Sequence, residues 1–371
     1  MNRSAKAPAH GGRVTQTLLI VSDEHLHRPT RQQACSAPSK ALQECTDGAW
    51  QCGGITFVSG ACIASAQKQP LSSSHSATPG SRIAVVGLGH MGDAFAENLL
   101  ADGHSVAVFD KKPDLVRALI VRGAVAGEGW AAIGTCDFVL TSLPDDAAVS
   151  AVADEIIPVL GRGAIHVSTS TISAALSRRL TERHREQGQG YVALPVLGNP
   201  DLAHRRGIYL LAAGLTRDID RIRPIFGKLG QRIFVIGPDP ALANVMKLAG
   251  NVLTAATLQS MGEVLALLRK SGIDPRTGYE VLTGSLFDGK VHKNYGGRIV
   301  RGEYTPAGLT VPLATKDLRL ALAEAEQAGV PMPVAAIVHD RLIAMMARGW
   351  DEFDWSALGK LAATEAGLED D

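Results

Sequence analysis

The chain has 371 residues, of which 46% are hydrophobic and 20% are charged. This length predicts about two domains, since domains run roughly 100–200 residues, and the hydrophobic content excludes a wholly disordered chain. The 37 basic residues balance the 37 acidic ones, so no net field attracts nucleic acid or an anionic membrane. No apolar run approaches the ~18–20 residues needed to span a bilayer. We therefore expect a cytoplasmic protein with neither a membrane nor a nucleic-acid partner.

Residues 1–80 differ in composition from the rest of the chain. They are rich in Ser, Gln, Ala and Gly and lack sustained periodicity, which predicts a disordered or poorly ordered extension. Four of the five cysteines lie in this segment, at Cys35, Cys45, Cys52 and Cys62. Because the sequence has no Cys-x-x-Cys pair and its His residues are not at zinc-site spacing, we expect reduced thiols and no metal site.

Regular structure is expected from Ser81 onward, with apolar strands and helical stretches in alternation. The first predicted strand is 83–86, followed by a helix over 93–102 and a second strand over 106–109. Further strands are predicted at 138–140, 164–167, 191–194, 208–213 and 232–236, with helical stretches around 113–122, 147–160 and 172–187. This alternation predicts an α/β fold with a Rossmann-type doubly wound, mostly parallel sheet over residues 81–241.

The pattern changes near Pro240. Residues 242–270 form one long helical stretch with few breakers that is apolar nearly all round, as expected of a buried helix. The pattern then stays helical to the end of the chain. We therefore predict an all-α C-terminal domain over 242–371, built on this long central helix and serving substrate binding and dimerisation. Its apolar character favours a homodimer or higher homo-oligomer.

A glycine-rich turn follows the first predicted strand and opens the first predicted helix. It reads Gly87-Leu88-Gly89-His90-Met91-Gly92. This fits the G-x-G-x-x-G pattern, in which the first glycine allows a tight turn, the second lets the backbone approach a pyrophosphate, and the third lets helix and strand pack closely. The segment is therefore predicted to bind NAD or NADP at the helix N-terminus.

Asp110 ends the next predicted strand, 23 residues after Gly87. A carboxylate at this position accepts hydrogen bonds from the ribose hydroxyls of NAD and repels the 2′-phosphate of NADP. Lys111 and Lys112 follow at once and are able either to pair with that phosphate or to remain solvated. The sequence thus favours NAD slightly and leaves NADP open, with Asp110 and Lys111 as cofactor-binding residues.

Several motifs, in the same order along the chain, resemble those of the β-hydroxyacid dehydrogenase family, which includes 3-hydroxyisobutyrate and 6-phosphogluconate dehydrogenases. The resemblance starts with the glycine turn and Ala96-Glu97-Asn98-Leu99, and it covers about residues 81–371. The family's catalytic motif is a Lys followed four residues later by Asn, here Lys247 and Asn251. The resemblance implies NAD(P)-dependent hydride transfer between nicotinamide and a small hydroxyacid- or semialdehyde-type substrate.

The pair of Lys247 and Asn251 also suits this chemistry by its residue types. Spacing of i, i+4 puts both side chains on one helix face. An ammonium group can donate a proton to a carbonyl oxygen that receives charge, and the free amine can act as the base in the reverse direction. Periodicity alone leaves open that Lys247 extends to solvent. The resemblance implies that Lys247 is the general acid or base and that Asn251 orients the substrate or the lysine.

Further site residues are implied by the resemblance. The stretch similar to the family's Asp-x-Ser-Thr-Ile motif reads Thr169-Ser170-Thr171-Ile172-Ser173. Ser170 would lie near the substrate and Thr171 near the nicotinamide ribose, although Thr171 or Ser173 also suits a helix N-cap. Leu143 and Pro144 match a cofactor-contacting pair. Lys316 matches a lysine that reaches the nicotinamide from the helical domain.

One loop departs from the family pattern. Where the family usually reads Pro-Val-Ser-Gly-Gly, this chain reads Pro195-Val196-Leu197-Gly198-Asn199. Leu197 replaces the hydroxyl that often binds a substrate carboxylate, while Gly198 and Asn199 stay as predicted substrate-binding residues. Two alternatives therefore remain open: an imine or ketone reductase on the same fold, and a non-catalytic NAD(P)-binding scaffold. Lys247 argues against both, because such relatives usually lack the lysine.

Overall fold

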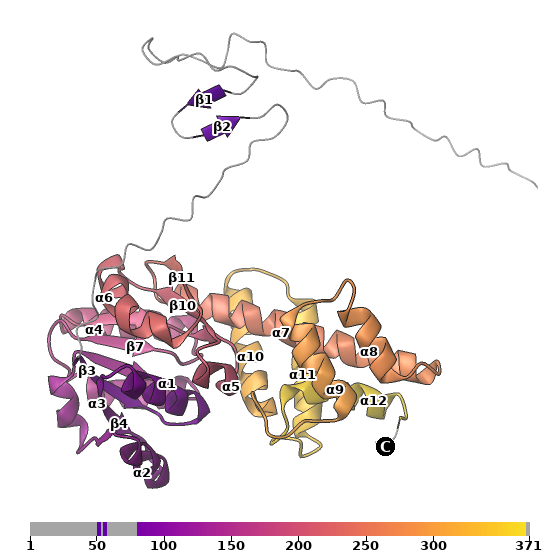
Figure 1. Cartoon of the computed structure of the whole chain (residues 1–371), viewed down its shortest axis with the longest axis horizontal. Helices are drawn as coiled ribbons and strands as arrows, with labels where there is room; N and C mark the ends of the chain where they lie inside the picture. The colour runs from indigo at the N-terminus through magenta and orange to yellow at the C-terminus, as the bar shows by residue number, and fades with distance from the viewer. Residues whose placement is uncertain (1–49, 53–54, 58–79, 369–371) are drawn as a thin grey trace, which may run out of the picture. The chain divides into compact units, whose positions relative to one another are not determined.

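The computed structural model describes residues 50–52, 55–57 and 80–368. Strands β1 (Trp50–Cys52) and β2 (Ile55–Phe57) pair antiparallel and belong to the first of two units of the chain, residues 1–73. The remainder of the predicted extension, except Gly80, lies outside the described residues. The second unit, residues 74–371, contains the sheet, the helices and all the site residues predicted from the sequence (Figure 1).

The second unit begins with a nine-stranded sheet, and six of its strands run parallel in the order β5-β4-β3-β6-β7-β8. Their bounds are β3 (Arg82–Val86), β4 (Ser105–Phe109), β5 (Val125–Ala126), β6 (Phe138–Thr141), β7 (Ile165–Ser168) and β8 (Gly190–Ala193). This is the strand order of a doubly wound dinucleotide-binding sheet. The predicted α/β Rossmann-type fold is confirmed.

The sheet is not parallel throughout. Strands β10 (Tyr209–Ala213) and β11 (Arg232–Gly237) run parallel to each other, but β10 is antiparallel to β8. The short strand β9 (Val196–Leu197), which periodicity did not predict, is antiparallel to β10 and sets Leu197 directly opposite Tyr209. Apolar runs carry no information on strand direction, so this edge of the sheet could not be derived from the sequence.

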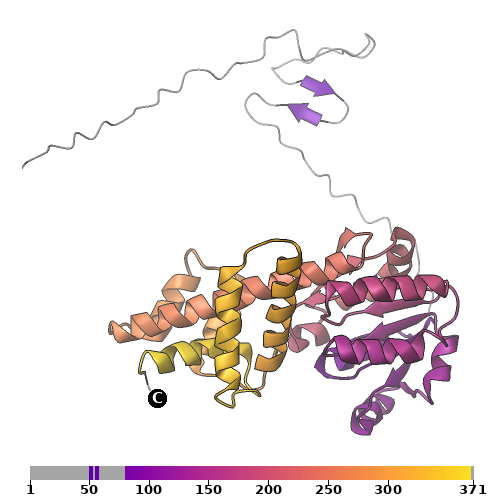
Figure 2. The same cartoon turned by 180° about the vertical axis from the view of Figure 1, so that it is seen from behind.

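Helices cover both faces of the sheet (Figures 1 and 2). Packed on one face are α1 (His90–Ala101), α2 (Pro113–Val121), α5 (Pro200–His204) and α6 (Thr216–Phe226). Packed on the other are η1 (Trp130–Thr135), α3 (Asp146–Ile156) and α4 (Ala174–Glu186). Strand β3 shows the cause: Ile83 and Val85 join one core cluster, whereas Ala84 and Val86 join the other. A strand buried on both faces reads as a continuous apolar run.

After β11 the described chain is helical, as predicted, and is organised around α7 (Ala241–Lys270). The other helices are α8 (Pro275–Thr283), α9 (Lys290–Arg301), α10 (Val311–Gln327), α11 (Pro333–Met346), η3 (Trp355–Ala357) and α12 (Leu358–Glu365). Figure 1 shows α7 running from the sheet through this helical domain, where it packs against α9, α10, α11 and α12. Leu258 of α7 shares a core cluster with Leu318, Leu342 and Trp355.

Helix α7 differs from the expectation of a helix buried all round. With 30 residues and a mean hydropathy of 1.2 over its most apolar 18-residue window, it is long and apolar enough to cross a membrane by length and composition. However, 44% of that window is buried inside the fold, where α7 forms the core of the helical domain. Several of its large apolar side chains are exposed, among them Leu253 at 72% and Leu267 at 64%.

Candidate active site

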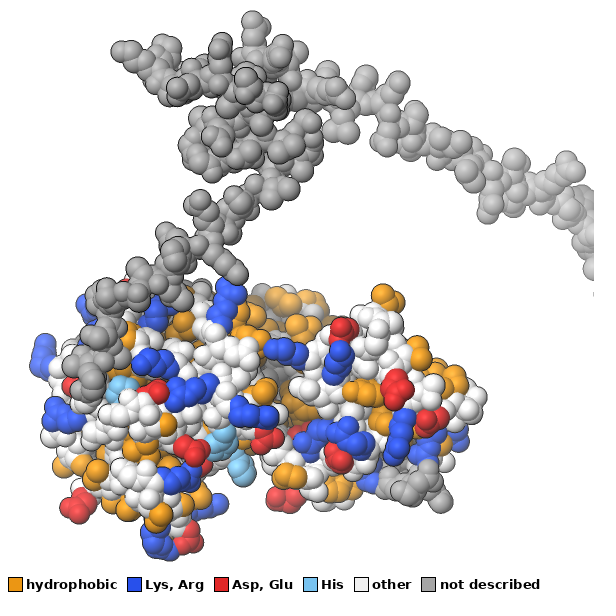
Figure 3. All heavy atoms as spheres, viewed as in Figure 1, with side chains coloured by type: hydrophobic (Ala, Val, Ile, Leu, Met, Phe, Trp, Pro, Cys, Tyr) orange, Lys and Arg blue, Asp and Glu red, His pale blue; other side chains and the backbone are white. Residues whose placement is uncertain are grey.

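A cleft of about 1690 Å³ lies between the carboxyl edge of the parallel strands and the helical domain. Figure 3 shows a hollow between these two parts of the second unit. Most residues predicted from the sequence line this cleft: Gly87, Gly89, His90, Met91, Asp110, Lys111, Leu143, Pro144, Ser170, Thr171, Gly198, Asn199, Lys247, Asn251 and Lys316. Leu88 and Gly92 do not line it, because both are buried in the packing beneath the turn. The fold thus gathers residues separated by more than 200 positions.

The glycine turn is shaped for close backbone contact. Gly87 has φ +88°, and a Cβ at this position would lie 2.4 Å from the carbonyl oxygen of Ser142. A Cβ at Gly92 would lie 1.8 Å from the carbonyl oxygen of Gly87, so helix α1 can approach the turn only without a side chain. A Cβ at Gly89 would meet no protein atom within 4 Å, which leaves open space before the first N–H groups of α1. This is the geometry that a pyrophosphate requires.

Asp110 is held at the carboxyl end of β4 by two backbone donors. Its carboxylate accepts hydrogen bonds from the N–H of Leu88 at 2.7 Å and the N–H of Lys112 at 2.8 Å. Phe109 and Trp130 stack beside it with ring centroids 5.7 Å apart, and both line the cleft. Sequence reasoning missed Trp130, because a single aromatic residue in a short 3₁₀ turn carries no periodic signal. The carboxylate and the aromatic pair form the far end of the cofactor half of the cleft.

Lys247 and Asn251 lie on the same face of α7, as their spacing predicts. Lys247 Nζ donates to Asn251 Oδ1 at 3.1 Å, and Asn251 Nδ2 donates to Asp317 Oδ2 at 2.5 Å. Burial lowers the pKa of Lys247, the charge of Lys316 lowers it further, and the carboxylate of Asp317 opposes both. Sequence reasoning did not include Asp317 in the site, although it stands next to Lys316 in a motif that the resemblance had singled out.

Lys316 connects α10 to the sheet. Its ammonium group donates to the carbonyl oxygens of Pro144 and Thr171, both at 2.7 Å, and lies 3.0 Å from Asp317 Oδ1. Pro144 follows β6 and Thr171 follows β7, so one side chain of the helical domain is bound to two loops at the carboxyl edge. Lys316 therefore fixes the helical domain against the cofactor half of the cleft.

The polar side chains of the loops after β7 and β8 already have structural partners. Ser170 Oγ accepts from the N–H of Leu143 at 2.8 Å, which leaves its hydroxyl hydrogen free to donate. Of the two N-caps considered for α4, the structure shows Ser173, whose side chain accepts from the N–H of Leu176. Asn199 caps α5 by accepting from the N–H of Leu202 at 2.9 Å. The Asn199 side chain thus retains its NH₂ group for a substrate.

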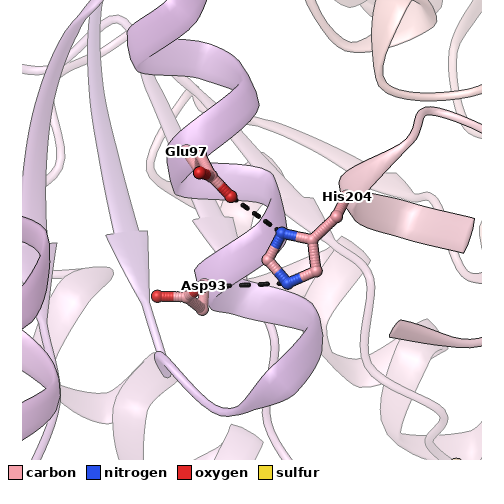
Figure 4. Close-up of side chains that lie close together, drawn as sticks. All are labelled: Asp93, Glu97 and His204. Carbon is pink, nitrogen blue, oxygen red and sulfur yellow. Dashed lines mark hydrogen bonds and ion pairs between the residues drawn. The ribbon is translucent and has the colours of Figure 1, made fainter. Parts of the chain in front are cut away.

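Helix α5 is attached to the cofactor helix α1 by polar side chains, His204 of α5 and the carboxylates Asp93 and Glu97 of α1 (Figure 4). His204 Nδ1 lies 2.8 Å from Glu97 Oε2, and its Nε2 lies 3.9 Å from Asp93 Oδ2. These three side chains offer atoms within 4.8 Å of one another, as a metal site would, but Arg122 already pairs with Asp93 at 2.6 Å. Just after the two helices, Arg206 donates two hydrogen bonds of 2.9 and 3.0 Å to the carboxylate of Asp102. The cluster therefore holds the loop that bears Leu197 and Asn199 against α1.

Two family models match this chain. The NAD-binding domain of 6-phosphogluconate dehydrogenase matches residues 82–237, and the NAD-binding model of NADP-dependent 3-hydroxyisobutyrate dehydrogenase matches residues 241–362. An uncharacterized oxidoreductase of Bacillus subtilis, YfjR, is 33% identical over 283 residues, which make up 75% of this chain and 99% of the relative. The chain belongs to the β-hydroxyacid dehydrogenase family.

A further relative and two solved structures are also similar to this chain. Glyoxylate/succinic semialdehyde reductase 1 of Arabidopsis thaliana is 30% identical over 280 residues, 74% of this chain and 96% of the relative. The crystal structure of a 3-hydroxyisobutyrate dehydrogenase from Salmonella typhimurium has the same fold, with a TM-score of 0.70 at 24% identity over 76% of this chain and 99% of that one. An imine reductase from Pseudomonas sp. also shares the fold, with a TM-score of 0.52 at 21% identity over 76% and 98% of the two chains. The predicted NAD(P)-dependent oxidoreductase is confirmed.

Proposed function

We propose that this dehydrogenase interconverts the carbonyl and alcohol forms of a small semialdehyde- or hydroxyacid-type substrate, with Lys247 as general acid and base. The hydrogen-bonded series from Lys247 through Asn251 to Asp317, inside the cleft, carries the proposal. The name of the Arabidopsis relative, a semialdehyde reductase, supports the substrate class.

The series fixes how Asn251 and Lys247 present their polar atoms. Because Asp317 can only accept, the Asn251 amide must direct its NH₂ group to that carboxylate and its oxygen to Lys247. One proton of the Lys247 ammonium group is held by Asn251, and the others are available to a substrate oxygen. Asn251 therefore orients the lysine, and the hydroxyl of Ser170, the backbone at Gly198 and the NH₂ group of Asn199 supply further substrate contacts.

The lowered pKa of Lys247 suits proton transfer in both directions. In reduction the ammonium group donates a proton to the carbonyl oxygen, and in oxidation the free amine removes the proton from the alcohol. Bound nicotinamide supplies or accepts the hydride. Burial makes the free amine accessible at a lower pH than in water, because the charged form loses its hydration. The role of the chain is thus to place one proton donor and acceptor beside the reacting carbonyl.

For the cofactor, the geometry favours NAD slightly over NADP. Asp110 is fixed by the N–H groups of Leu88 and Lys112, so its charge stays where a ribose 2′-phosphate would approach. Lys111 and Lys112 line the same end of the cleft and keep NADP usable. We expect a higher kcat/KM for NADH than for NADPH with the same carbonyl substrate.

We further propose that the dehydrogenase is a homodimer, in which a second copy covers one face of α7. This face bears the exposed apolar side chains Leu242, Met246, Leu253, Val264 and Leu267. Exposed Ala249 and Ser260 stand between them, so the row steps by three or four residues along the helix, except for the seven residues, or two turns, between Leu253 and Ser260. A row of exposed large apolar side chains of this kind is typical of an interface rather than of a solvated surface.

The test is steady-state turnover followed by the absorbance of reduced nicotinamide, with NADH or NADPH against semialdehydes, short keto acids, bulkier aldehydes and cyclic imines. We expect reduction of semialdehydes by the wild type and a loss of about 10²-fold or more in the Lys247→Ala variant. Lys270→Ala is the matched control, because Lys270 is exposed at the other end of α7 and does not line the cleft.

The two alternatives give different results in the same experiment. Turnover of cyclic imines that does not depend on Lys247 would identify an imine reductase and refute the proposed role of the lysine. Cofactor binding in a fluorescence titration without turnover of any compound would identify a non-catalytic scaffold.

A further inference from the structure

Asn244 lies in the first turn of α7, just before Lys247, and is fully buried there. Its side chain does not line the cleft, so it is not placed to contact substrate or cofactor. Asn244, Lys247 and Asn251 follow one another at spacings of three and four residues, which puts all three side chains on one face of the helix. The face that carries the proposed proton donor therefore begins with a buried amide.

The Asn244 amide has one long hydrogen bond and one atom without a partner. Its Nδ2 donates to the carbonyl oxygen of Ser170 at 3.5 Å, and its Oδ1 is buried with no hydrogen-bond partner among the described residues. Because a carbonyl oxygen can only accept, the NH₂ group must face Ser170. An unpartnered buried oxygen destabilises a fold, and the buried neighbours Ala241 and Ala243 have no polar side chain. Packing alone therefore does not account for an asparagine at this position, whereas a role in the site would.

Asn244 contacts the loop after β7, which lines the cleft with Ser170 and Thr171. The same loop is attached to the loop after β6, because Ser170 Oγ accepts from the N–H of Leu143 at 2.8 Å. It is also attached to α10, because the Thr171 carbonyl oxygen accepts from Lys316 Nζ at 2.7 Å. Asn244 supplies the attachment of this loop to α7, the helix of the proposed proton donor.

From these contacts, and resting on the proposed function, we infer that Asn244 is a positioning residue for proton transfer by Lys247. Its amide holds the Ser170 backbone against α7 just before Lys247, and thereby sets the position of the Ser170 hydroxyl relative to the lysine. In the proposed function both groups contact the substrate, so a change in their relative position would put the carbonyl oxygen out of reach of the Lys247 proton in part of the bound molecules. Loss of the Asn244 amide should therefore lower kcat more than it changes substrate binding.

The experiment compares the Asn244→Ala variant of the full chain with Gln259→Ala, its matched control. Gln259 is a second buried side-chain amide on α7 whose oxygen has no partner among the described residues, but it stands beside Leu258 of the helical core and does not line the cleft. Both variants are measured for melting temperature, and for kcat and KM with the best carbonyl substrate of the wild type. The isotope effect on kcat is measured with cofactor deuterated at the transferred hydrogen. A double variant, Asn244→Ala with Lys247→Ala, completes the set.

Asn244→Ala should lower kcat by about 10-fold and leave KM within about twofold of the wild type, because misplaced reacting groups slow the chemical step rather than binding. The isotope effect should rise, since hydride transfer becomes slower relative to product release. The melting temperature should stay close to that of the wild type, because alanine favours the helix and the unpartnered oxygen is gone. Gln259→Ala should keep the kcat and the isotope effect of the wild type. In the Lys247→Ala background, loss of the Asn244 amide should lower kcat by less than about twofold, because Asn244 acts through Lys247.

The inference is overturned if Asn244→Ala keeps the kcat and the isotope effect of the wild type, or if it lowers kcat by the same factor with and without Lys247. Asn244→Thr keeps the test valid should the alanine variant not fold, since threonine has nearly the volume of asparagine and its hydroxyl can donate to the backbone of its own turn instead of Ser170. A wild-type kcat in Asn244→Thr would equally overturn the inference. If turnover then still depends on Lys247, the proposed function stands. If Lys247→Ala turns over as fast as the wild type, both fail together.

Discussion

The buried histidines of the sheet give a quantitative prediction about pH. His166 and His184 lie on β7 and α4, and both are fully buried. Their hydrogen bonds run in a chain: Thr141 Oγ1 to His166 Nε2 at 2.9 Å, His166 Nδ1 to His184 Nε2 at 2.8 Å, and His184 Nδ1 to Gln189 Oε1 at 2.7 Å. Gln189 donates its NH₂ group to two carbonyl oxygens, so its oxygen must accept. Each histidine is therefore neutral with its proton on Nδ1.

This row of hydrogen bonds has no acceptor for an added proton, so the stability of the fold depends on pH. Burial lowers the pKa of His184 from 6.5 to about 4. Burial, together with His184, lowers the pKa of His166 well below 6.5. Between pH 6.5 and 4 the unfolded chain binds protons that the folded chain does not, so stability falls as pH falls through this window. At about 1.4 kcal/mol for each pH unit, His184 alone removes about 3 kcal/mol by pH 4.

The assay is urea unfolding of the full chain at intervals between pH 7 and pH 4.5. The matched variant is His184→Gln, because glutamine also offers one donor group and one acceptor but does not titrate. We expect the free energy of unfolding to fall with acid in the wild type and less steeply in His184→Gln. His90→Gln, at the exposed start of α1, should keep the slope of the wild type. Equal slopes in all three proteins would refute the neutral histidine chain.

Three further predictions concern the cleft and its surroundings. Gly92→Ala should lower both the melting temperature and the affinity for NADH, because its Cβ would lie 1.8 Å from the Gly87 oxygen, whereas Gly89→Ala should lower the affinity alone. Differential scanning fluorimetry with and without NADH tests this, and equal melting temperatures of the two variants without NADH would contradict it. Asp317→Asn should lower the pKa of Lys247 further, because the charge of Asp317 raises it. The acidic side of the pH profile of kcat/KM for alcohol oxidation should therefore move to lower pH, and an unchanged profile would argue against Lys247 as the base. Leu267→Asp should convert the proposed dimer to a monomer in light scattering, because Leu267 is 64% exposed on the apolar row of α7 and does not line the cleft. A wild type that is itself monomeric would disprove the proposed interface.

Much of the cofactor half of the cleft could be predicted from the sequence, because its signals are local. The turn Gly87-Leu88-Gly89-His90-Met91-Gly92 needs glycine wherever a Cβ would strike the backbone, and this restriction is visible in six consecutive residues. Asp110 follows from the alternation of strand and helix. The pairing of Lys247 with Asn251 follows from one turn of helix, although their place in the cleft was implied only by a resemblance.

The substrate half depends on contacts that no local pattern encodes. Asn251 and Asp317 are 66 residues apart, and Lys316 reaches the Pro144 carbonyl across 172 residues. The neighbours Leu197 and Tyr209 depend on the antiparallel direction of β10, which an apolar run does not specify.

The sequence by itself determined the main alternation of strands and helices around the cofactor half, the glycine-rich turn and the lysine–asparagine face of the long helix, since each follows from spacing within a few turns. Only the tertiary structure decided which side of α7 is exposed, which carboxylate orients Asn251 and which residue of β10 lies opposite Leu197. Those features depend on how distant segments pack, and packing is set by shape and burial over the whole fold rather than by periodicity.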